Sequence, residues 1–325
     1  MAEWLVEAGI GETRAALIDG DRILEARILP EGELVAGTIV EARLLARLPE
    51  RNQGVVAWGE HEALVTPLPT GVTQGALTLV EITRPATPEP GKPKRARARP
   101  ASPGARPGPG ASPLGDLGTL LPLQGSDRLG AAGWAELLEE AATGAIAFPG
   151  GALSIHLTPA MTLIDVDGTL AAPALAVAGA RAAAAAIRRL DIAGSIGIDL
   201  PGGGEKAARH AAAQAIDAAL PQPFERTAVN GFGFVQIVRR RTRRSLPELY
   251  AAEAPLAHAR ALLRLAERTA GAGERTLTAH PAVLAELTAR PAWIAELTRR
   301  LGTPVALRAD AALTISGGHV QARHP

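Results

Sequence analysis

Two aspartates follow apolar runs in the second half of the chain, where the strands of an α/β sheet often place reacting groups. Asp165 ends the run Met161-Thr-Leu-Ile, and Asp199 ends the run Ser195-Ile-Gly-Ile. A helix predicted over 173–190 separates the two runs, so a right-handed crossover would make the strands parallel neighbours about 5 Å apart. Neighbouring carboxylates repel each other unless a cation lies between them, and Mg²⁺ accepts such a sparse set of oxygen ligands. The spacing predicts a Mg²⁺ site at Asp165 and Asp199, although aspartates that merely cap turns give the same pattern.

A third carboxylate, Asp167, lies two residues after Asp165. The segment Asp165-Val-Asp-Gly-Thr-Leu170 is similar to the first motif of haloacid-dehalogenase-like phosphatases, in which the first Asp is the nucleophile and the second is a general acid. That family also has a downstream lysine followed by a paired acidic motif. Lys206 is the only lysine after Asp165, and no such acidic pair follows it. A phosphatase therefore remains an alternative with only local support.

The basic residues are clustered although the chain is nearly neutral. Its 325 residues include 34 basic and 33 acidic residues, which gives a net charge of +1. A run of arginines follows the strand predicted over 233–238, and guanidinium groups suit phosphate geometry, although a solvated basic strand end would look the same. The run comprises Arg239, Arg240, Arg241, Arg243 and Arg244. The chain has no cysteine, which excludes disulfides and thiolate zinc sites, so we expect no zinc.

The elements that must position these residues indicate an α/β core. Strands alternate with helices along 114–255, a pattern that favours a parallel or mixed sheet. The predicted strands cover 145–148, 152–157, 161–166, 195–200 and 233–238, and the predicted helices cover 131–142, 173–190 and 205–220. A closing α/β segment, 256–325, adds predicted helices over 256–270, 281–290 and 292–301 and predicted strands over 305–308 and 314–315.

The N-terminal part has a different pattern, in which short β-rich runs replace the alternation of strands and helices. Residues 1–33 predict a β-hairpin turned at Asp19-Gly20-Asp21, and 34–84 contain short β-rich runs at the spacing of a small barrel. Residues 85–113 are rich in proline and arginine and predict a disordered linker. Trp58 is the one aromatic residue in the predicted barrel, and it fits a core position as well as a stacking platform for bases.

Three motifs in this order resemble the ribonuclease E/G family of bacterial endoribonucleases. Residues 145–167 are similar to that family's Gly-Gly hairpin and its Thr-x-Ile-Asp-Val-Asn signature, and Ser195-Ile-Gly-Ile-Asp-Leu200 resembles its Ile-Val-Ile-Asp-Phe strand. Residues 231–246 are like its Gly-Leu-Val-Glu-Met-Thr-Arg-x-Arg segment. The resemblance implies an α/β nuclease core with a mixed or parallel sheet and an OB-type barrel inserted after the first hairpin.

The same resemblance implies a cytoplasmic, Mg²⁺-dependent endoribonuclease that hydrolyses single-stranded RNA to 5′-phosphate products during RNA processing or turnover. Asp165 and Asp199 match the metal-binding acids of the family. Asp167 stands where the family has Asn, and it would add a ligand or a hydrogen bond to the attacking water. The arginines of 239–244, together with Trp58, would contact the RNA.

Departures from the family pattern support a second interpretation. Gly202 stands where the family has another acid, and Val56 and Leu64 replace the barrel aromatics that would stack on bases. A non-catalytic RNA-binding protein that retains the nuclease fold is therefore the main alternative. No apolar run is long enough to span a membrane, so we expect no membrane partner. The family's zinc-bridging cysteine pair is absent, which argues against that tetramer and leaves a homodimer open.

Overall fold

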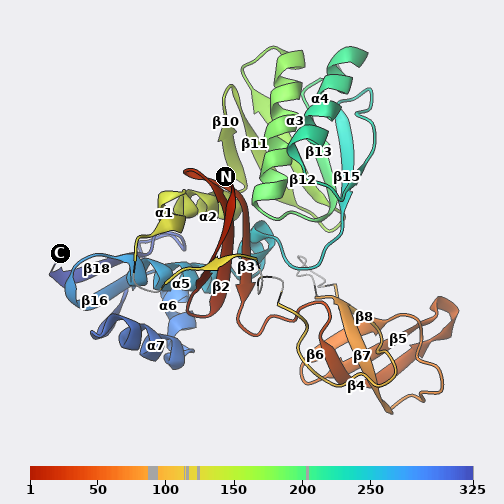
Figure 1. Cartoon of the computed structure of the whole chain (residues 1–325), viewed down its shortest axis with the longest axis horizontal. Helices are drawn as coiled ribbons and strands as arrows, with labels where there is room; N and C mark the ends of the chain where they lie inside the picture. Colours follow the sequence, from red (N-terminus) through yellow and green to blue (C-terminus); the bar gives the residue numbers. More distant parts are fainter. Residues whose placement is uncertain (87–93, 113, 115–116, 123–124, 203–204, 325) are drawn as a thin grey trace.

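The structure is a computed structural model, and it describes residues 1–86, 94–112, 114, 117–122, 125–202 and 205–324. A small barrel stands apart from a larger α/β body, which carries a six-stranded sheet at one end and the C-terminal segment at the other (Figure 1). The expected fold class, a mixed α/β body with an N-terminal β-barrel, is confirmed. In the described residues no helix combines the length and apolar character needed to cross a membrane.

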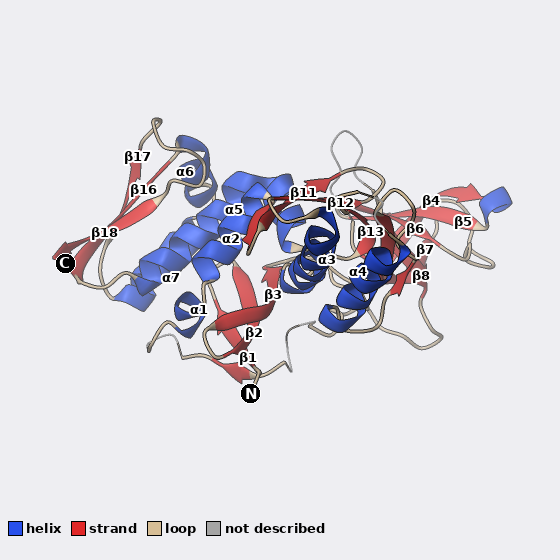
Figure 2. Cartoon of the chain, turned by 90° about the horizontal axis from the view of Figure 1, so that it is seen from above, coloured by secondary structure: helices blue, strands red, loops and turns tan. Residues whose placement is uncertain are grey.

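The six-stranded sheet contains both aspartate runs. Its strand order is β10-β11-β12-β13-β15-β14, in which β12 and β13 are parallel and the other pairs are antiparallel. The helices α3 (Ala172–Arg189) and α4 (Lys206–Ala219) lie side by side over one face (Figures 1 and 2). The strands are β10 (Ala145–Phe148), β11 (Gly151–Leu157), β12 (Thr162–Gly168), β13 (Gly194–Asp199), β14 (Glu225–Arg226) and β15 (Phe234–Arg239). The strands and helices predicted for this region are confirmed to within a few residues at their ends.

Side-chain alternation fixes which face of this sheet is buried. Ile164 and Val166 of β12 are buried on the face beneath α3, whereas Asp165 between them is exposed. Gly179 allows α3 to approach closely, because a Cβ atom there would lie 2.3 Å from Cγ1 of Val166. The alanine-rich sequence of α3 therefore produces a tight contact between helix and sheet.

A second sheet is formed by the N-terminal strands in the order β3-β2-β1-β9. The predicted turn at Asp19-Gly20-Asp21 is confirmed between β2 and β3, and the structure adds an earlier hairpin between β1 and β2. The strands are β1 (Glu3–Ala8), β2 (Glu12–Asp19), β3 (Arg22–Pro30) and β9 (Thr119–Leu120), and the short helices α1 (Arg128–Ala131) and α2 (Trp134–Thr143) follow. Buried side chains of this sheet and of the six-stranded sheet belong to one continuous apolar core.

The barrel is closed by five strands in the order β4-β5-β6-β8-β7. The predicted disordered linker is wrong for β8, which pairs with β6 and β7. Ala96 and Ala98 lie in the barrel core, and the arginines that alternate with them are exposed. The high content of arginine and proline therefore predicted a linker where the chain forms a strand. Residues 87–93 and 113 of that segment lie outside the described part. The elements are β4 (Ile39–Leu48), the 3₁₀ turn η1 (Pro49–Arg51), β5 (Gln53–Trp58), β6 (His61–Val65), β7 (Leu77–Arg84) and β8 (Ala96–Pro100).

The C-terminal segment forms a third sheet in the order β17-β16-β18, with its own apolar cluster. The helices predicted over 281–290 and 292–301 and the first closing strand are confirmed, whereas the helix predicted over 256–270 is only the later part of α5, which begins at Leu246. The second closing strand lies at β18 and not at 314–315, and β16 was not predicted. Helix α5 has a capping box at Ser245 and a kink at Glu253, and it connects this segment to the rest of the body. The elements are α5 (Leu246–Arg268), β16 (Ala272–Ala279), α6 (Pro281–Thr288), α7 (Pro291–Leu301), β17 (Val305–Ala309) and β18 (His319–His324).

Candidate active site

The two strand-end aspartates are register partners. Asp165 of β12 lies opposite Asp199 of β13 in a parallel pair, so the strand axes are separated by about 4.8 Å. Register partners point to the same side of a sheet, and both side chains are exposed on the face opposite α3 and α4. The structure therefore brings together the two residues that the sequence predicts as a pair.

The open face, as we call the side of the six-stranded sheet opposite α3 and α4, carries a mixed set of side chains. Asp167 lies on it two residues beyond Asp165 and is paired with Ala152 of β11. The antiparallel partners of β13 place aromatic and apolar groups on the same side as the acids. The residues of the open face include His156, Leu163, Asp165, Asp167, Asp199, Phe234, Gln236 and Val238.

Phe234 is the register partner of Asp199 and lies half-buried beside the acid pair. A Cβ atom at Gly197 would lie 2.5 Å from Cζ of Phe234 and 2.9 Å from Cδ2 of Leu163. Gly197 therefore leaves space above β13 that these two side chains fill. The acids consequently lie next to a flat apolar surface.

A second aromatic residue lies in the turn that leads into β15. The Oδ1 atom of Asn230 accepts hydrogen bonds from the backbone N–H groups of Phe232, at 2.9 Å, and Phe234, at 3.0 Å. Gly233 has a φ of +91°, and its carbonyl accepts a bond from the N–H of Leu200, immediately after Asp199. The turn is fixed by these bonds, yet the Phe232 side chain is 87 % exposed.

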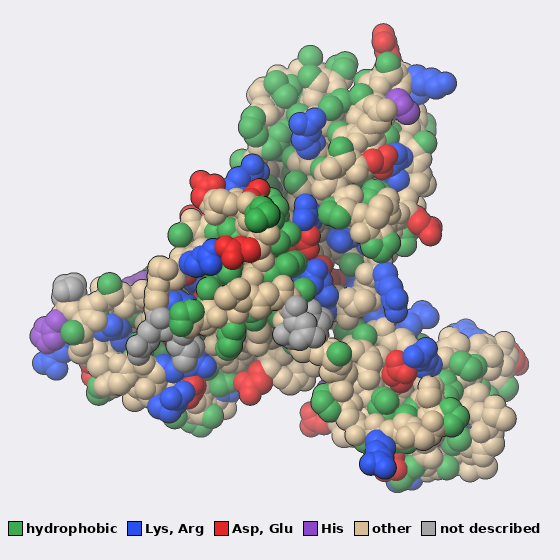
Figure 3. Space-filling view, viewed as in Figure 1, with side chains coloured by type: hydrophobic (Ala, Val, Ile, Leu, Met, Phe, Trp, Pro, Cys, Tyr) green, Lys and Arg blue, Asp and Glu red, His purple; other side chains and the backbone are tan. Residues whose placement is uncertain are grey.

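The end of the open face that is nearer the barrel borders a cavity of about 1090 Å³. His156, Ser195 and Val238 line it from the sheet, and Arg84, Lys94 and Arg97 line it from the barrel side. The Lys94 ammonium donates a hydrogen bond of 3.0 Å to the carbonyl of Pro159, which connects the two parts. Basic side chains gather where the six-stranded sheet approaches the barrel (Figure 3).

Most of the predicted RNA-binding arginines make contacts within the chain. Arg239 donates to the carbonyl of Ile192 at 2.8 Å, and Arg241 pairs with Glu248 at 2.8 Å. Arg243 pairs with Asp191, and Arg244 pairs with Glu33 and Glu253. Arg240 is exposed and, within the described residues, has no such partner. The geometry thus gives four of these arginines a role in holding elements together, and RNA contact by the cluster remains a prediction.

Trp58 lies at the end of β5, far along the chain from the acids. Its ring is half-buried against the barrel core and lies 5.5 Å from the His61 ring, centroid to centroid. One part of the ring packs against the barrel core and another part reaches the surface, so the core position is confirmed in part and stacking on bases stays a prediction.

The two register-paired carboxylates suit a hard cation such as Mg²⁺, which is bound by few protein oxygens and retains several waters. Among the described residues, no cluster of three or more His, Asp and Glu side chains is arranged to hold a metal ion. Asp165 and Asp199 would accordingly act as a two-carboxylate site, with Asp167 nearby on the same strand.

Sequence analysis missed the aromatic and barrel-side residues of this region. Phe232 and Phe234 were visible only as part of an Asn-Gly-Phe-Gly-Phe segment, and Arg97 as part of a presumed linker. The Asn-Gly dipeptide before an apolar strand marks a turn, and this is the sequence feature that could have drawn attention to Phe232 and Phe234.

A search with protein-family models finds no match to this chain, and a search of curated proteins finds none either.

Proposed function

We propose that the chain is a Mg²⁺-dependent endoribonuclease that cuts single-stranded RNA on the open face. The observation that carries the proposal is the register pairing of Asp165 with Asp199. Both side chains are exposed on the open face, opposite α3 and α4. The three motifs that resemble the ribonuclease E/G family support it, since they contribute β10 to β13 and β15 of the same sheet.

The acid pair would hold the metal. When bound, Mg²⁺ supplies Lewis-acid stabilisation of charge at a phosphate and lowers the pKa of water. Without a cation, the two carboxylates would repel an RNA phosphate, so their own charge makes cleavage dependent on a divalent ion. Asp167 lies on the same face and would orient the attacking water through a hydrogen bond.

The neighbouring residues would hold the RNA strand. Phe234 lies beside the acids and Phe232 projects from the adjoining turn, so each offers a face on which a base can stack. Arg97 and Arg240 are exposed and, in the described part of the chain, have no ion-pair partner, which leaves their guanidinium groups available for phosphates. We infer that the strand enters between the barrel and the sheet, and that the five-stranded barrel is of the OB type.

The experiment is a cleavage assay on a fluorogenic single-stranded RNA with Mg²⁺ or Mn²⁺. Removing either metal-binding carboxylate, in Asp165→Asn or Asp199→Asn, should lower the rate by roughly 100-fold or more. Asp21→Asn serves as the matched control because Asp21 is exposed in a turn of the N-terminal sheet. Circular dichroism verifies that each variant is folded.

Three outcomes would separate the alternatives. Cleavage that neither substitution changes would contradict the assignment of the site. RNA binding without cleavage in the wild-type protein would support the non-catalytic alternative. Hydrolysis of a phosphomonoester that depends on Asp165 and Asp167 would support a haloacid-dehalogenase-like phosphatase.

A further inference from the structure

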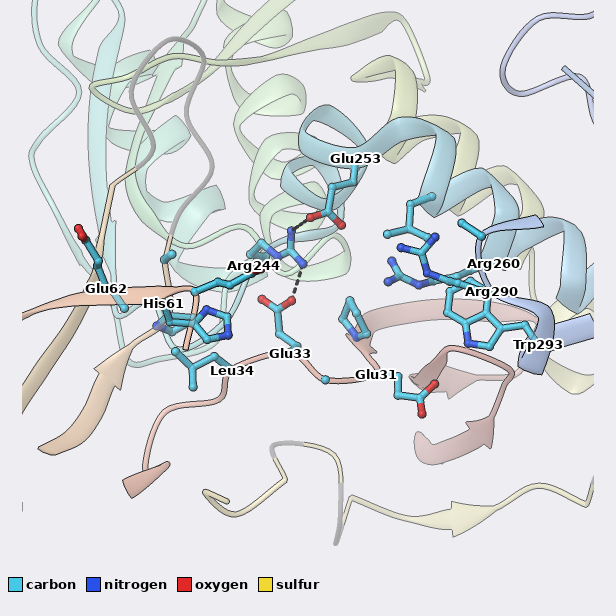
Figure 4. A pocket seen from close by; sticks show the side chains of 18 of the residues that line it. Glu31, Glu33, Leu34, His61, Glu62, Arg244, Glu253, Arg260, Arg290 and Trp293 are labelled. Carbon is cyan, nitrogen blue, oxygen red and sulfur yellow. Dashed lines mark hydrogen bonds and ion pairs between the residues drawn. The ribbon is translucent and has the colours of Figure 1, made fainter. Parts of the chain in front are cut away.

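A second cavity, of about 1050 Å³, lies between the barrel and the C-terminal segment (Figure 4). Its walls come from the end of β3, the barrel strands β6 and β8, the helix α5 and the start of α7. None of the residues that line it belongs to the six-stranded sheet. It is thus separate from the acid pair on the open face.

One wall of this cavity contains a buried arginine without an anionic partner. Arg260 of α5 is only 6 % exposed, and within the described residues its guanidinium makes no hydrogen bond or ion pair. Burial lowers the pKa of Arg260. A buried guanidinium normally has a carboxylate or a set of carbonyls to bind, because the loss of hydration is otherwise uncompensated.

The other buried arginines of the described chain follow that rule. Arg14 pairs with Glu7 and Glu12 at 2.6 Å each, and Arg264 pairs with Glu7 at 2.9 Å. Arg275 donates to backbone carbonyls, the nearest being that of Gly271 at 2.7 Å. Arg260 is the exception, and it is the one that lines a cavity of this size.

A second guanidinium lies close to Arg260. The Arg260 Cζ atom is 5.7 Å, and the Arg290 Cζ atom 5.2 Å, from the centroid of the Trp293 ring. An edge of that indole is held against Gly11, where a Cβ atom would come within 2.3 Å of the ring. The Trp293 ring thus fixes both guanidinium groups through cation–π contacts at the same end of the cavity, as Figure 4 shows.

Among the described residues, the acids that line the cavity form no ion pair with Arg260. Glu33 and Glu253 are paired with Arg244, and Glu62 is paired with Arg95. Glu286, outside the cavity lining, pairs with Arg290 and not with Arg260. The two acids that attract Arg260 electrostatically, Glu12 and Glu253, form their ion pairs with Arg14 and Arg244. The remaining acids of the lining, Glu31 and Glu60, are exposed to solvent.

We propose that Arg260 and Arg290 form a binding site for a phosphate group, carried by a free nucleotide or by an RNA strand. The rigid fork of a guanidinium can donate two hydrogen bonds to one phosphate. Arg260 supplies a fork that no carboxylate in the described part of the chain occupies, and Arg290, whose pair with Glu286 takes up part of its charge, lies beside it as a second donor. The size of the cavity leaves room for the sugar and base attached to that phosphate. This site goes beyond the proposed cleavage and does not depend on it.

The test is calorimetric titration of the full chain with inorganic phosphate, with AMP and with a single-stranded oligonucleotide. Phosphate and AMP should bind saturably, and Arg260→Met should raise their Kd by roughly tenfold or more, because a charge-assisted hydrogen-bond donor is lost. Arg260→Lys should recover part of the affinity, since it retains the charge but lacks the fork. Arg308→Met is the matched control, as Arg308 is exposed on β17 and should leave every Kd unchanged.

The probes distinguish the source of the phosphate. An Arg260-dependent Kd for phosphate and AMP assigns a free nucleotide, and a dependence seen only with the oligonucleotide assigns an RNA strand. Arg260→Met should be at least as resistant to urea as the wild-type protein, because it removes an uncompensated buried charge. Equal binding to the wild-type and Arg260→Met proteins, no binding of any probe, or equally strong binding of succinate would overturn the proposal. Asp165→Asn should bind phosphate normally, so this site and the cleavage site can fail separately.

Discussion

Phe232 is an exposed aromatic side chain on a backbone turn that hydrogen bonds hold in place. Its side chain is 87 % exposed, although burying a phenyl ring would be favourable by about 1.5–3 kcal/mol. The backbone that carries it is nevertheless fixed by hydrogen bonds to Asn230 and by the contact of Gly233 with Leu200. A rigidly presented, solvent-facing ring next to Asp199 is suited to stack on a base of a bound strand.

We predict that Phe232→Ala weakens RNA binding by about 1–3 kcal/mol, the usual contribution of one stacked base. The effect should be seen in KM for the single-stranded RNA more than in kcat, because the ring does not contact the acid pair chemically. The free energy of unfolding should change by less than about 0.5 kcal/mol, since the ring has little packing to lose.

Leu120→Ala is the matched control for this substitution. Leu120 is 63 % exposed on β9 of the N-terminal sheet, so its removal takes away a similar exposed apolar group at another place. An equal loss of RNA affinity in both variants would contradict a specific role for Phe232.

At the scale of elements, the packing of α3 against β12 determines the position of Asp165. Gly179 lies directly over Val166, the residue that follows Asp165 on the buried face. A side chain at this glycine would push the helix away from the strand, and β12 carries one half of the acid pair. The tight contact thus connects helix composition to the geometry of the site.

Gly179→Val should lower the free energy of unfolding by about 1–3 kcal/mol, as overpacking of a dense core does. Urea denaturation measures this change. Val166→Ala in the same chain should restore part of the loss, because it removes the methyl groups that would clash.

Ala185→Val is the control for a general effect of a β-branched residue in this helix. Ala185 is exposed on α3, and the substitution should lower the free energy of unfolding by less than about 1 kcal/mol. Similar losses in the two valine variants would argue against the close contact.

The acid pair could be predicted because its geometry follows from local rules. Apolar runs that end in Asp165 and Asp199, separated by one helix, leave little freedom in how the two strands pair, and the structure shows them in register. The barrel strand β8 could not be predicted in this way. Its alternation of alanine and arginine is recognisable only once the interior that accepts Ala96 and Ala98 is known.

The arginines after β15 show a second limit of sequence reasoning. Their number indicates a basic surface, but Arg239, Arg241 and Arg243 each have acceptors that come from distant parts of the chain or from other elements. Pairing of this kind depends on tertiary contacts that a single sequence does not reveal. The turn that exposes Phe232 is a similar case, because its Asn-Gly signal gives a turn but not the exposure of the ring.

Across the whole molecule, an ion cluster connects the first strand to a helix more than 250 residues later. Glu7 of β1 is buried, and it pairs with Arg14 at 2.6 Å, with Arg264 at 2.9 Å and with Arg268 at 2.7 Å. Burial alone would raise the pKa of Glu7, but the three guanidinium groups outweigh it and lower the pKa to about 2. The N-terminal sheet and α5 are therefore held together by a group that must remain ionised.

This pKa gives the stability of the protein a definite dependence on pH. Because the pKa of Glu7 is depressed in the folded state, its contribution is fully present above pH 4.5 and is lost as the pH falls towards 2. The contribution amounts to about 3 kcal/mol at neutral pH by linkage. Glu7→Gln should lower the free energy of unfolding at pH 7 by about 3–5 kcal/mol, since it leaves buried arginines without a counter-charge.

Urea denaturation at pH 3 and at pH 7 measures both effects. The difference in stability between the two pH values should be smaller in Glu7→Gln than in the wild-type protein. Glu60→Gln provides the control, as Glu60 is exposed in a barrel turn and should leave the pH dependence unchanged. A pH dependence identical in wild type and Glu7→Gln would contradict the role given to this cluster.

The most direct test of the account is a Mn²⁺ titration followed by electron paramagnetic resonance, with Asp165→Asn, Asp199→Asn and the double variant compared with the wild-type protein. If the two carboxylates share one cation, each single substitution should weaken Mn²⁺ binding by roughly tenfold or more, and the double variant should lose less than the two single losses combined. Independent, additive losses, or single variants that bind Mn²⁺ as tightly as the wild-type protein, would contradict a shared metal site.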